Sequence, residues 1–328
     1  MSLIQFTEKG MYVPFANVYI DPFVSVDKAI VTHAHGDHIK RGCSSYLSHI
    51  QSIPILNRRL GKNKYEGVQY GIPVHINGVK FSFHPAGHIL GSSQIRVEYK
   101  GEVWVASGDY KMEDDEVHTP FESIKCNTFI TESTFGLPEF DWLPQQSIFE
   151  EINQWWHTNA EAGICSIIFA YSLGKAQRII QHLNHANGPV FAHGSIENMN
   201  DAYKEAGIIL KPTQKPSNYI NKKDFRKALI IAPPSADTSI WLKKFEPYIT
   251  AKASGWIGNL NSNQGSITDT GFALSDHADW KGLNKAVKDS QAQKVIVTHG
   301  YTSEFAQWLN QNGIEAEAVK TQFDGNVI

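Results

Sequence analysis

The stretch that decides the fold spans residues 32–38 and reads Thr32-His33-Ala34-His35-Gly36-Asp37-His38. It follows the apolar residues 29–31, which predict the end of a β-strand. Side chains at positions i and i+2 of a helix point to opposite sides, so His33 and His35 can share a metal ion only in a loop. The glycine and the small alanine between the ligands permit the tight path that such a loop needs. The stretch therefore predicts a metal-binding loop directly after a strand.

Four potential ligands, three imidazoles and one carboxylate, fall within six residues of this stretch. In a chain of 328 residues with 14 histidines, such a pattern occurs by chance in roughly one sequence in a thousand. The alternative is a solvated polar loop. Imidazole and carboxylate without thiolate suit zinc, manganese or iron, and we expect two zinc ions, with manganese as the alternative.

Further ligands are expected at the ends of other strands, because four clustered side chains cannot complete two metal sites. His88 follows a strand pattern and has glycines on both sides, whereas His84 lies inside that pattern and is the weaker candidate. Asp109 follows an apolar strand, and His299 and Asp21 also lie at predicted strand ends. The alternatives are a satisfied polar side chain for His88 and an Asx-turn for Asp109.

The composition is that of a folded protein without an overall basic character. Of the residues, 41% are hydrophobic and 19% are charged, which predicts one large or two modest domains. Thirty Lys and Arg against 33 Asp and Glu leave a formal charge of -3. A nucleic-acid partner would therefore need a local basic patch, and residues 201–252 offer one with ten Lys or Arg against five Asp or Glu.

The cysteines and the apolar runs indicate a cellular compartment. The three cysteines are scattered and form no C-x-x-C pair, so we expect neither disulfides nor a thiolate zinc site. The N-terminal residues lack the pattern of a secretory leader, and no apolar run reaches 18 residues. We therefore expect a cytoplasmic protein that does not associate with a membrane.

The texture of the sequence changes after about residue 135. Before that point the chain is dense in short β-like runs bounded by turn residues. From about residue 145, strand and helix patterns alternate, which predicts parallel α/β units and a second lobe. The polar residues 211–223 are the one linker-like stretch.

These motifs together resemble the metallo-β-lactamase-fold nucleases with a β-CASP insertion, which include mRNA 3'-end cleavage factors, RNase J and DNA cross-link repair nucleases. The matching residues, in chain order, are Asp21; His33, His35, Asp37 and His38; His88; Asp109; Glu132 within residues 131–136; His277 within residues 275–279; and His299 within residues 297–300. The resemblance implies an α/β protein in which residues 1–136 and 268–328 form a metallo-β-lactamase αββα sandwich. Residues 137–267 would form an inserted β-CASP α/β cap.

The resemblance also implies a role for each of these side chains. One metal would be held by His33, His35 and His88, a second by Asp37, His38 and His299, with Asp109 bridging the pair. Asp37 counts as catalytic as well as a ligand, and Asp21 would orient a ligand by hydrogen bonding. Two such ions suit phosphodiester hydrolysis.

His277 matches the family's general acid, and Glu132 would hold its imidazole in the charged form that donates a proton. Neither residue is expected to bind metal. The alternative is that Glu132 caps a turn and that His277 lies in the polar lead-in to a helix that begins near Trp280.

Two segments of the second lobe are candidates for substrate binding. Ser172, Gly174 and Lys175 join a strand pattern to a helix pattern, where backbone N–H groups and the lysine suit a phosphate. His193 and Ser195 open the next helix in the same way. A plain helix N-cap is the alternative in both places.

The resemblance implies a hydrolase: a metal-dependent nuclease, and we expect an exonuclease, that cleaves single-stranded DNA or RNA. The bacterial ligase-associated exonucleases suggest DNA repair with a DNA ligase and helicase system as partners, whereas His299 is typical of the branch that acts in RNA processing. The alternatives are a catalytically silent nucleic-acid scaffold and a hydrolase of small thioesters or esters on the same metal core.

Overall fold

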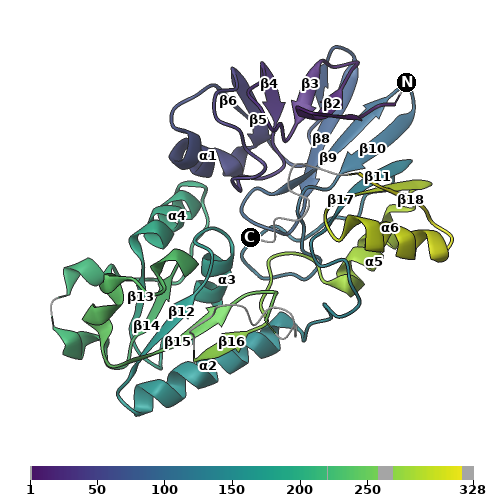
Figure 1. The fold of residues 1–328 in the computed structure, drawn as a ribbon. Coiled ribbons are helices and arrows are strands. Elements are labelled where there is room, and N and C mark those ends of the chain that lie inside the picture. Colours follow the sequence, from purple (N-terminus) through teal and green to yellow (C-terminus); the bar gives the residue numbers. More distant parts are fainter. Residues whose placement is uncertain (1, 220, 258–268, 320–328) are drawn as a thin grey trace. The chain divides into compact units, whose positions relative to one another are not determined.

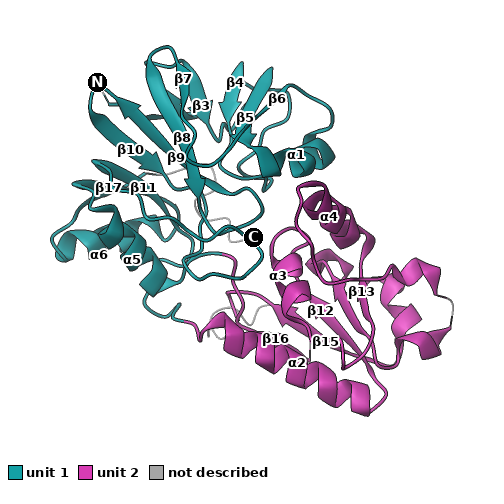
Figure 2. Ribbon diagram, turned by 180° about the vertical axis from the view of Figure 1, so that it is seen from behind, with its two compact units in different colours: residues 1–141, 277–328 teal, residues 142–276 magenta. Residues whose placement is uncertain are grey.

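The computed structural model describes residues 2–219, 221–257 and 269–319 and divides into two compact units (Figures 1 and 2). Unit 1 comprises residues 1–141 and 277–328, and unit 2 comprises residues 142–276. Unit 2 begins and ends a few residues later than the predicted insert. The predicted C-terminal boundary, residue 267, lies outside the described residues.

Unit 1 opens with a six-stranded sheet in the order β1-β2-β3-β4-β5-β6. Its elements are β1 (Gln5–Thr7), β2 (Gly10–Val13), β3 (Val18–Ile20), β4 (Lys28–Ile30), β5 (Ser45–His49), η1 (Ile50–Ser52), α1 (Ile53–Leu60) and β6 (Tyr65–Val68). Strands β1 to β3 are antiparallel, and β3 to β6 pair in parallel. Parallel pairing brings the carboxyl ends of β3 and β4, where Asp21 and the loop of residues 32–38 begin, to the same edge.

The second sheet of unit 1 has seven strands in the order β18-β17-β11-β10-β9-β8-β7. Its elements are β7 (Val74–Ile76), β8 (Val79–Pro85), β9 (Ser93–Tyr99), β10 (Glu102–Ala106), β11 (Thr128–Ser133), α5 (Trp280–Ser290), β17 (Lys294–Gly300), α6 (Thr302–Gln311) and β18 (Glu315–Ala318). Strand β11 pairs in parallel with both β10 and β17. The returning C-terminal part of the chain thus completes a sheet that the N-terminal part begins.

Alternating side chains of the second sheet build two cores. Trp104 and Ala106 of β10 pack with Ile20 and Leu47 of the first sheet, whereas Val105 packs with residues of α5 and α6. This alternation follows from the period of two of a β-strand. Figure 1 shows α5 and α6 beside β17, and α1 beside the first sheet. The layers are therefore those of the predicted αββα sandwich.

Unit 2 is built on a parallel five-stranded sheet in the order β13-β14-β12-β15-β16. Its elements are α2 (Gln145–Glu161), β12 (Cys165–Phe169), α3 (Lys175–His182), β13 (Val190–Ala192), α4 (Gly194–Glu205), η2 (Pro216–Asn218), η3 (Lys222–Phe225), β14 (Leu229–Ala232), η4 (Pro234–Ala236), η5 (Ile240–Phe245), β15 (Tyr248–Ala253) and β16 (Thr270–Phe272). The α-helices contribute to the core on one face of the sheet and the short 3-10 segments to the core on the other. Burial on both faces explains why its strands are nearly continuous apolar runs.

The linker-like stretch of residues 211–223 is packed against this sheet. Gln214 forms a β-bridge with Phe191, and the ring of Tyr219 lies 5.0 Å from the ring of Phe191. The described part of this polar stretch is thus anchored to the sheet at Gln214 and Tyr219.

Candidate metal centre

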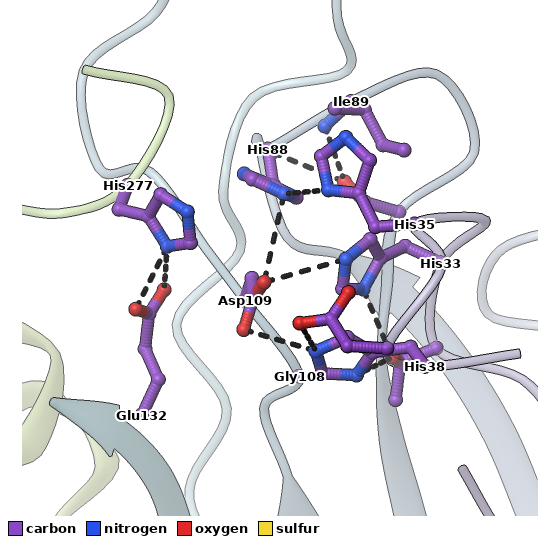
Figure 3. A network of polar contacts seen from close by, with 12 residues as sticks. His33, His35, His38, His88, Ile89, Gly108, Asp109, Glu132 and His277 are labelled. Atoms are coloured by element: carbon purple, nitrogen blue, oxygen red, sulfur yellow. Dashed lines mark hydrogen bonds and ion pairs between the residues drawn. The ribbon is translucent and has the colours of Figure 1, made fainter. Parts of the chain in front are cut away.

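The stretch of residues 32–38 is a loop between β4 and β5, as its spacing predicts. His33 and His38 are buried, with 0% and 2% of their surface exposed. The irregular backbone turns His33 and His35 toward each other, so that their ring centroids lie 5.0 Å apart. Figure 3 shows the imidazoles gathered around Asp109.

One compact group consists of His33, His35, His88 and Asp109, which offer ligand atoms that all lie within 4.8 Å of one another. Nε2 of His88 lies 2.9 Å from Nδ1 of His35. Nε2 of His33 lies 3.4 Å from Oδ2 of Asp109. Three imidazoles and a carboxylate at these distances form a donor set that can hold one metal ion.

A second compact group consists of Asp37, His38 and Asp109. Nε2 of His38 lies 3.4 Å from Oδ1 of Asp109 and 3.7 Å from Oδ2 of Asp37. The two oxygens of Asp109 thus face different groups, which is the placement of a bridging ligand. His299 lies beside this group, with its ring centroid 5.3 Å from that of His38.

The buried nitrogens fit a metal ion. Within the described part of the chain, Nε2 of His33 and Nε2 of His38 have no hydrogen-bond partner. Two atoms that bind one tetrahedral ion at about 2.0–2.2 Å lie roughly 3.3–3.6 Å apart. The nitrogen-to-oxygen distance from each of these histidines to Asp109, 3.4 Å, lies in that range. Metal ligation would satisfy both nitrogens.

The surroundings of Asp109 and His88 shift the pKa of each side chain toward the form that binds metal. Burial raises the pKa of Asp109, but the charges of His38 and His33 outweigh burial and hold that pKa well below its ordinary value. Burial lowers the pKa of His88 well below its ordinary value, with the like charges of His277 and His33 adding to the effect. An ionised carboxylate and a neutral imidazole are the forms that bind metal.

His38 shows how negative the centre is without an ion. Burial lowers its pKa, but Asp109, Asp37 and Asp21 outweigh burial and raise that pKa well above its ordinary value. Three carboxylates around one imidazole create a field that a divalent cation neutralises.

Asp21 orients His38 from the end of β3. Its Oδ2 accepts a hydrogen bond from Nδ1 of His38 at 2.7 Å, which directs Nε2 toward Asp109. The same carboxylate accepts the backbone N–H of Thr32 at 2.9 Å and the hydroxyl of Thr32 at 2.6 Å. Asp21 and His299 both have left-handed backbone conformations, with φ of 44° and 53°. Such conformations cluster at functional sites.

Glu132 and His277 form a pair beside the metal ligands. Glu132 is 1% exposed and lies where the pairing of β11 with β17 shifts register. Its carboxylate accepts Nδ1–H of His277 at 2.9 Å and the backbone N–H of Tyr110 at 2.7 Å. The ring of His277 lies 4.7 Å from that of His88 (Figure 3). Asp109, Glu132 and His277 form a third compact group of possible ligands.

The candidate substrate-binding residues all lie in unit 2. Oγ of Ser172 and Oγ of Ser195 are 2.9 Å apart, and His193 caps α4 by accepting the N–H of Ser195 at 3.1 Å. Gly174 precedes α3 with a left-handed φ of 92°. Lys175 is buried and forms an ion pair with Asp276 at 3.2 Å. The structure therefore gives Lys175 a partner within the protein.

Sequence reasoning missed two contributors to the site. Thr32 ties the metal loop to Asp21, and its one signal in the sequence is its position between the strand and the first histidine. The backbone N–H of Tyr110 holds Glu132, and a backbone contact between positions 22 residues apart leaves no signal in side-chain types.

No protein-family model matches the chain. A probable DNA ligase of Opitutus terrae is 29% identical over 315 residues, which cover 94% of this chain and 30% of that protein. The endoribonuclease YSH1 of Eremothecium gossypii is 32% identical over 120 residues, which cover 36% of this chain and 15% of that protein. The chain thus spans about a third or less of these two relatives.

An RNase J-like protein of Methanocaldococcus jannaschii is matched over a larger share of its own length. It is 27% identical over 271 residues, which cover 71% of this chain and 61% of that protein. A crystal structure of a protein of unknown function from Enterococcus faecalis V583 superposes with a TM-score of 0.60 at 14% identity. It covers 90% of this chain and 79% of that chain, and it supports the fold alone. The chain is thus similar to proteins named as a probable DNA ligase, an endoribonuclease and an RNase J-like protein, and its ordered motifs and its sandwich fit the resemblance to the metallo-β-lactamase-fold proteins of the β-CASP family.

Proposed function

We propose that the protein is a metal-dependent nuclease that hydrolyses phosphodiester bonds of single-stranded nucleic acid, as an exonuclease. The observation that carries the proposal is the placement of a carboxylate–imidazole pair, Glu132 and His277, beside two ligand groups that share Asp109. The relatives named as endoribonuclease and as RNase J-like protein support nucleic acid as the substrate. Zinc is the proposed ion, with manganese as the alternative.

The proposed metal ligands form two sites that share one residue. His33, His35 and His88 would hold one, Asp37, His38 and His299 the other, and Asp109 would bridge them. When bound, such a pair of ions lowers the pKa of water and neutralises charge on a scissile phosphate. Asp21 keeps His38 in the tautomer whose Nε2 faces the centre.

His277 is the proposed general acid. Because Nδ1–H donates to Glu132, Nε2 is the ring nitrogen that hands a proton to the leaving oxygen. Glu132 stabilises the charged imidazole, and its second bond, to the N–H of Tyr110, fixes the carboxylate in place. A thiolate leaves without taking up a proton, so hydrolysis of a small thioester needs no such pair, which favours a phosphodiester substrate.

The partners follow from the relatives. Likeness to a probable DNA ligase supports DNA as the nucleic acid, and the proposed role is then DNA end repair with a DNA ligase and helicase system as partners. Likeness to an endoribonuclease supports RNA instead, and the proposed role is then RNA 3'-end processing. Among the described residues no helix is long and apolar enough to cross a membrane. The scattered cysteines support the cytoplasmic location that we propose.

The test is degradation of end-labelled single-stranded DNA and RNA oligonucleotides of one sequence, with zinc or manganese. His277→Ala should lower kcat by about 100- to 10,000-fold, which is the usual contribution of a general acid. His75→Ala, which removes an exposed histidine of β7, is the matched control and should leave kcat unchanged.

DNA cleaved in preference to RNA would favour end repair, and the reverse would favour RNA processing. Activity on neither oligonucleotide, with two ions bound per chain, would overturn the proposal in favour of a silent scaffold or a small-ester hydrolase.

A further inference from the structure

Two basic side chains are buried in the first turns of α3. Lys175 and Arg178 are 3% and 0% exposed. They are three residues apart on a helix, so they project from the same face. A buried lysine or arginine is costly unless it is paired, so their partners indicate their role.

Each of these side chains contacts the segment of residues 275–276. Nζ of Lys175 lies 3.2 Å from Oδ1 of Asp276, and Nη1 of Arg178 donates to the backbone carbonyl of Ser275 at 3.2 Å. Asp276 is itself only 3% exposed. One contact holds a side chain and the other holds the backbone, so the segment is fixed in both position and orientation.

This segment leads directly into His277. On the far side of His277, the N–H of Ala278 donates to the carbonyl of Tyr110 at 2.6 Å. The N–H of the same Tyr110 holds Glu132, which accepts Nδ1–H of His277. His277 therefore lies on a short segment that is fixed one residue before it by α3 and one residue after it by Tyr110.

We propose that Lys175 and Arg178 are positioning residues, which place the imidazole of His277 by holding residues 275–276. This inference rests on the proposed function of His277 as general acid. The phosphate-binding role that the sequence suggested for Lys175 is the competing interpretation. The two interpretations predict different effects. In the positioning role, Lys175 is paired with a carboxylate and affects the transfer of a proton to the leaving group; in the phosphate-binding role, it would affect the affinity for a polyanion.

The principal variant is the double substitution Lys175→Met with Asp276→Asn. A single substitution removes one charge of a buried ion pair and is destabilising, whereas removing both charges of the pair often costs less. The matched control, Lys285→Met with Asp289→Asn, removes an exposed ion pair on α5. Folding is checked by circular dichroism and metal content by elemental analysis.

The kinetic test uses two substrates for each protein. On an oligonucleotide, the double variant should lose about 10- to 100-fold in kcat, because a displacement near 1 Å misaligns the acid, with KM changed less than about twofold. On bis(p-nitrophenyl) phosphate, whose leaving group needs no proton, kcat should stay within about twofold of the parent. The control variant should match the parent on both substrates.

A structural readout does not depend on turnover. If α3 fixes the segment, amide hydrogen exchange of a peptide that covers residues 273–280 should accelerate in the double variant, with exchange in β8 and β9 unchanged. An inactive parent would refute the proposed function while this measurement still tests the contact.

Three outcomes would overturn the positioning role. The first is a folded double variant with unchanged kcat on the oligonucleotide. The second is a rise in KM with a weaker salt dependence at constant kcat, which is the signature of a lost phosphate contact. The third is an equal loss on both substrates, which would indicate a general disturbance of the metal centre.

Discussion

At the scale of single residues, Asp21 supports the candidate metal-binding loop of residues 32–38 through hydrogen bonds. The carboxylate of Asp21 accepts three hydrogen bonds, two from Thr32 and one from His38, and each is 2.9 Å or shorter. A carboxylate with a left-handed φ of 44° at this position serves both the backbone turn and the imidazole. Asp and Asn tolerate that conformation better than other residues, which makes Asn a conservative replacement.

Asp21→Asn should weaken metal binding by about 10- to 100-fold, because the imidazole of His38 loses its charged hydrogen-bond acceptor. Competition with a fluorescent chelator measures the change. Asp27→Asn, at an exposed neighbouring position, is the control and should bind zinc like the parent. Equal affinity in all three proteins would show that Asp21 does not support the site.

His49 illustrates a residue effect on stability. It is 4% exposed, stacks on Tyr70 with ring centroids 3.6 Å apart, and within the described residues its Nδ1 has no hydrogen-bond partner. Burial lowers the pKa of His49 to about 4, whereas an unfolded histidine titrates near 6.5. Between these values the unfolded chain binds a proton that the folded chain excludes, so stability falls as the pH falls from about 6.5 to about 4.

His49→Phe should keep the stacking on Tyr70 and remove the contribution of His49 to the pH dependence of stability. The free energy of unfolding of the variant, from urea titrations with chelator present, should lose less between pH 7 and pH 5 than that of the parent. The difference is at most about 1.4 kcal/mol per pH unit. Parallel pH dependences in the two proteins would rule the explanation out.

At the scale of elements, the site is assembled where loops meet. The loop after β8 carries His88, and the segment after β10 carries Asp109. The N–H of Lys111 donates to the carbonyl of Ala86 at 3.0 Å, which joins the two. A Cβ on Gly87 would lie 2.3 Å from the carbonyl oxygen of Lys111, and Gly87 has a φ of 72°. Only glycine fits both demands.

Gly87→Ala should therefore separate the two loops, lower the zinc content, and destabilise the protein by more than the backbone conformation alone would. Gly101→Ala isolates that conformational part, because Gly101 has a φ of 84° and among described residues nothing lies within 4 Å of its added Cβ. The control should lose about 1–2 kcal/mol and keep its zinc. Thermal unfolding measures the stability of each variant, and elemental analysis measures its zinc content. Equal losses of stability in both variants would contradict the packing argument.

The sequence predicted this site well where chemistry is local. The spacing of His33, His35 and His38 needs a loop whatever the rest of the chain does, and strand ends beside glycines indicated His88. Contacts between distant positions leave no such signal. The ion pair of Lys175 joins it to Asp276, about a hundred positions away, and nothing in the local sequence around Lys175 indicates that partner.

At the scale of the whole molecule, the chain forms two units with separate hydrophobic cores. All the candidate metal ligands come from unit 1, whereas unit 2 has a core of its own around the parallel sheet. Asp21, Asp37 and Asp109 all lie near His38, and without a bound cation their charges face histidines and, at Asp37, Arg59. Metal binding should therefore stabilise unit 1 selectively, because ligands stabilise the state that binds them.

Removal of zinc with a chelator should lower the unfolding temperature of unit 1 and leave that of unit 2 nearly unchanged. At a free zinc concentration 1,000 times the Kd, each site contributes about 4 kcal/mol to the metal-loaded form. Hydrogen exchange followed by mass spectrometry separates the units: peptides of β8 to β11 should lose protection, and peptides of β12 and β14 should keep it. His33→Ala, which removes a ligand, should show the lowered stability with or without chelator. If both units lost protection to the same extent, the metal would be stabilising one cooperative fold, and the description of two units with independent stability would fail.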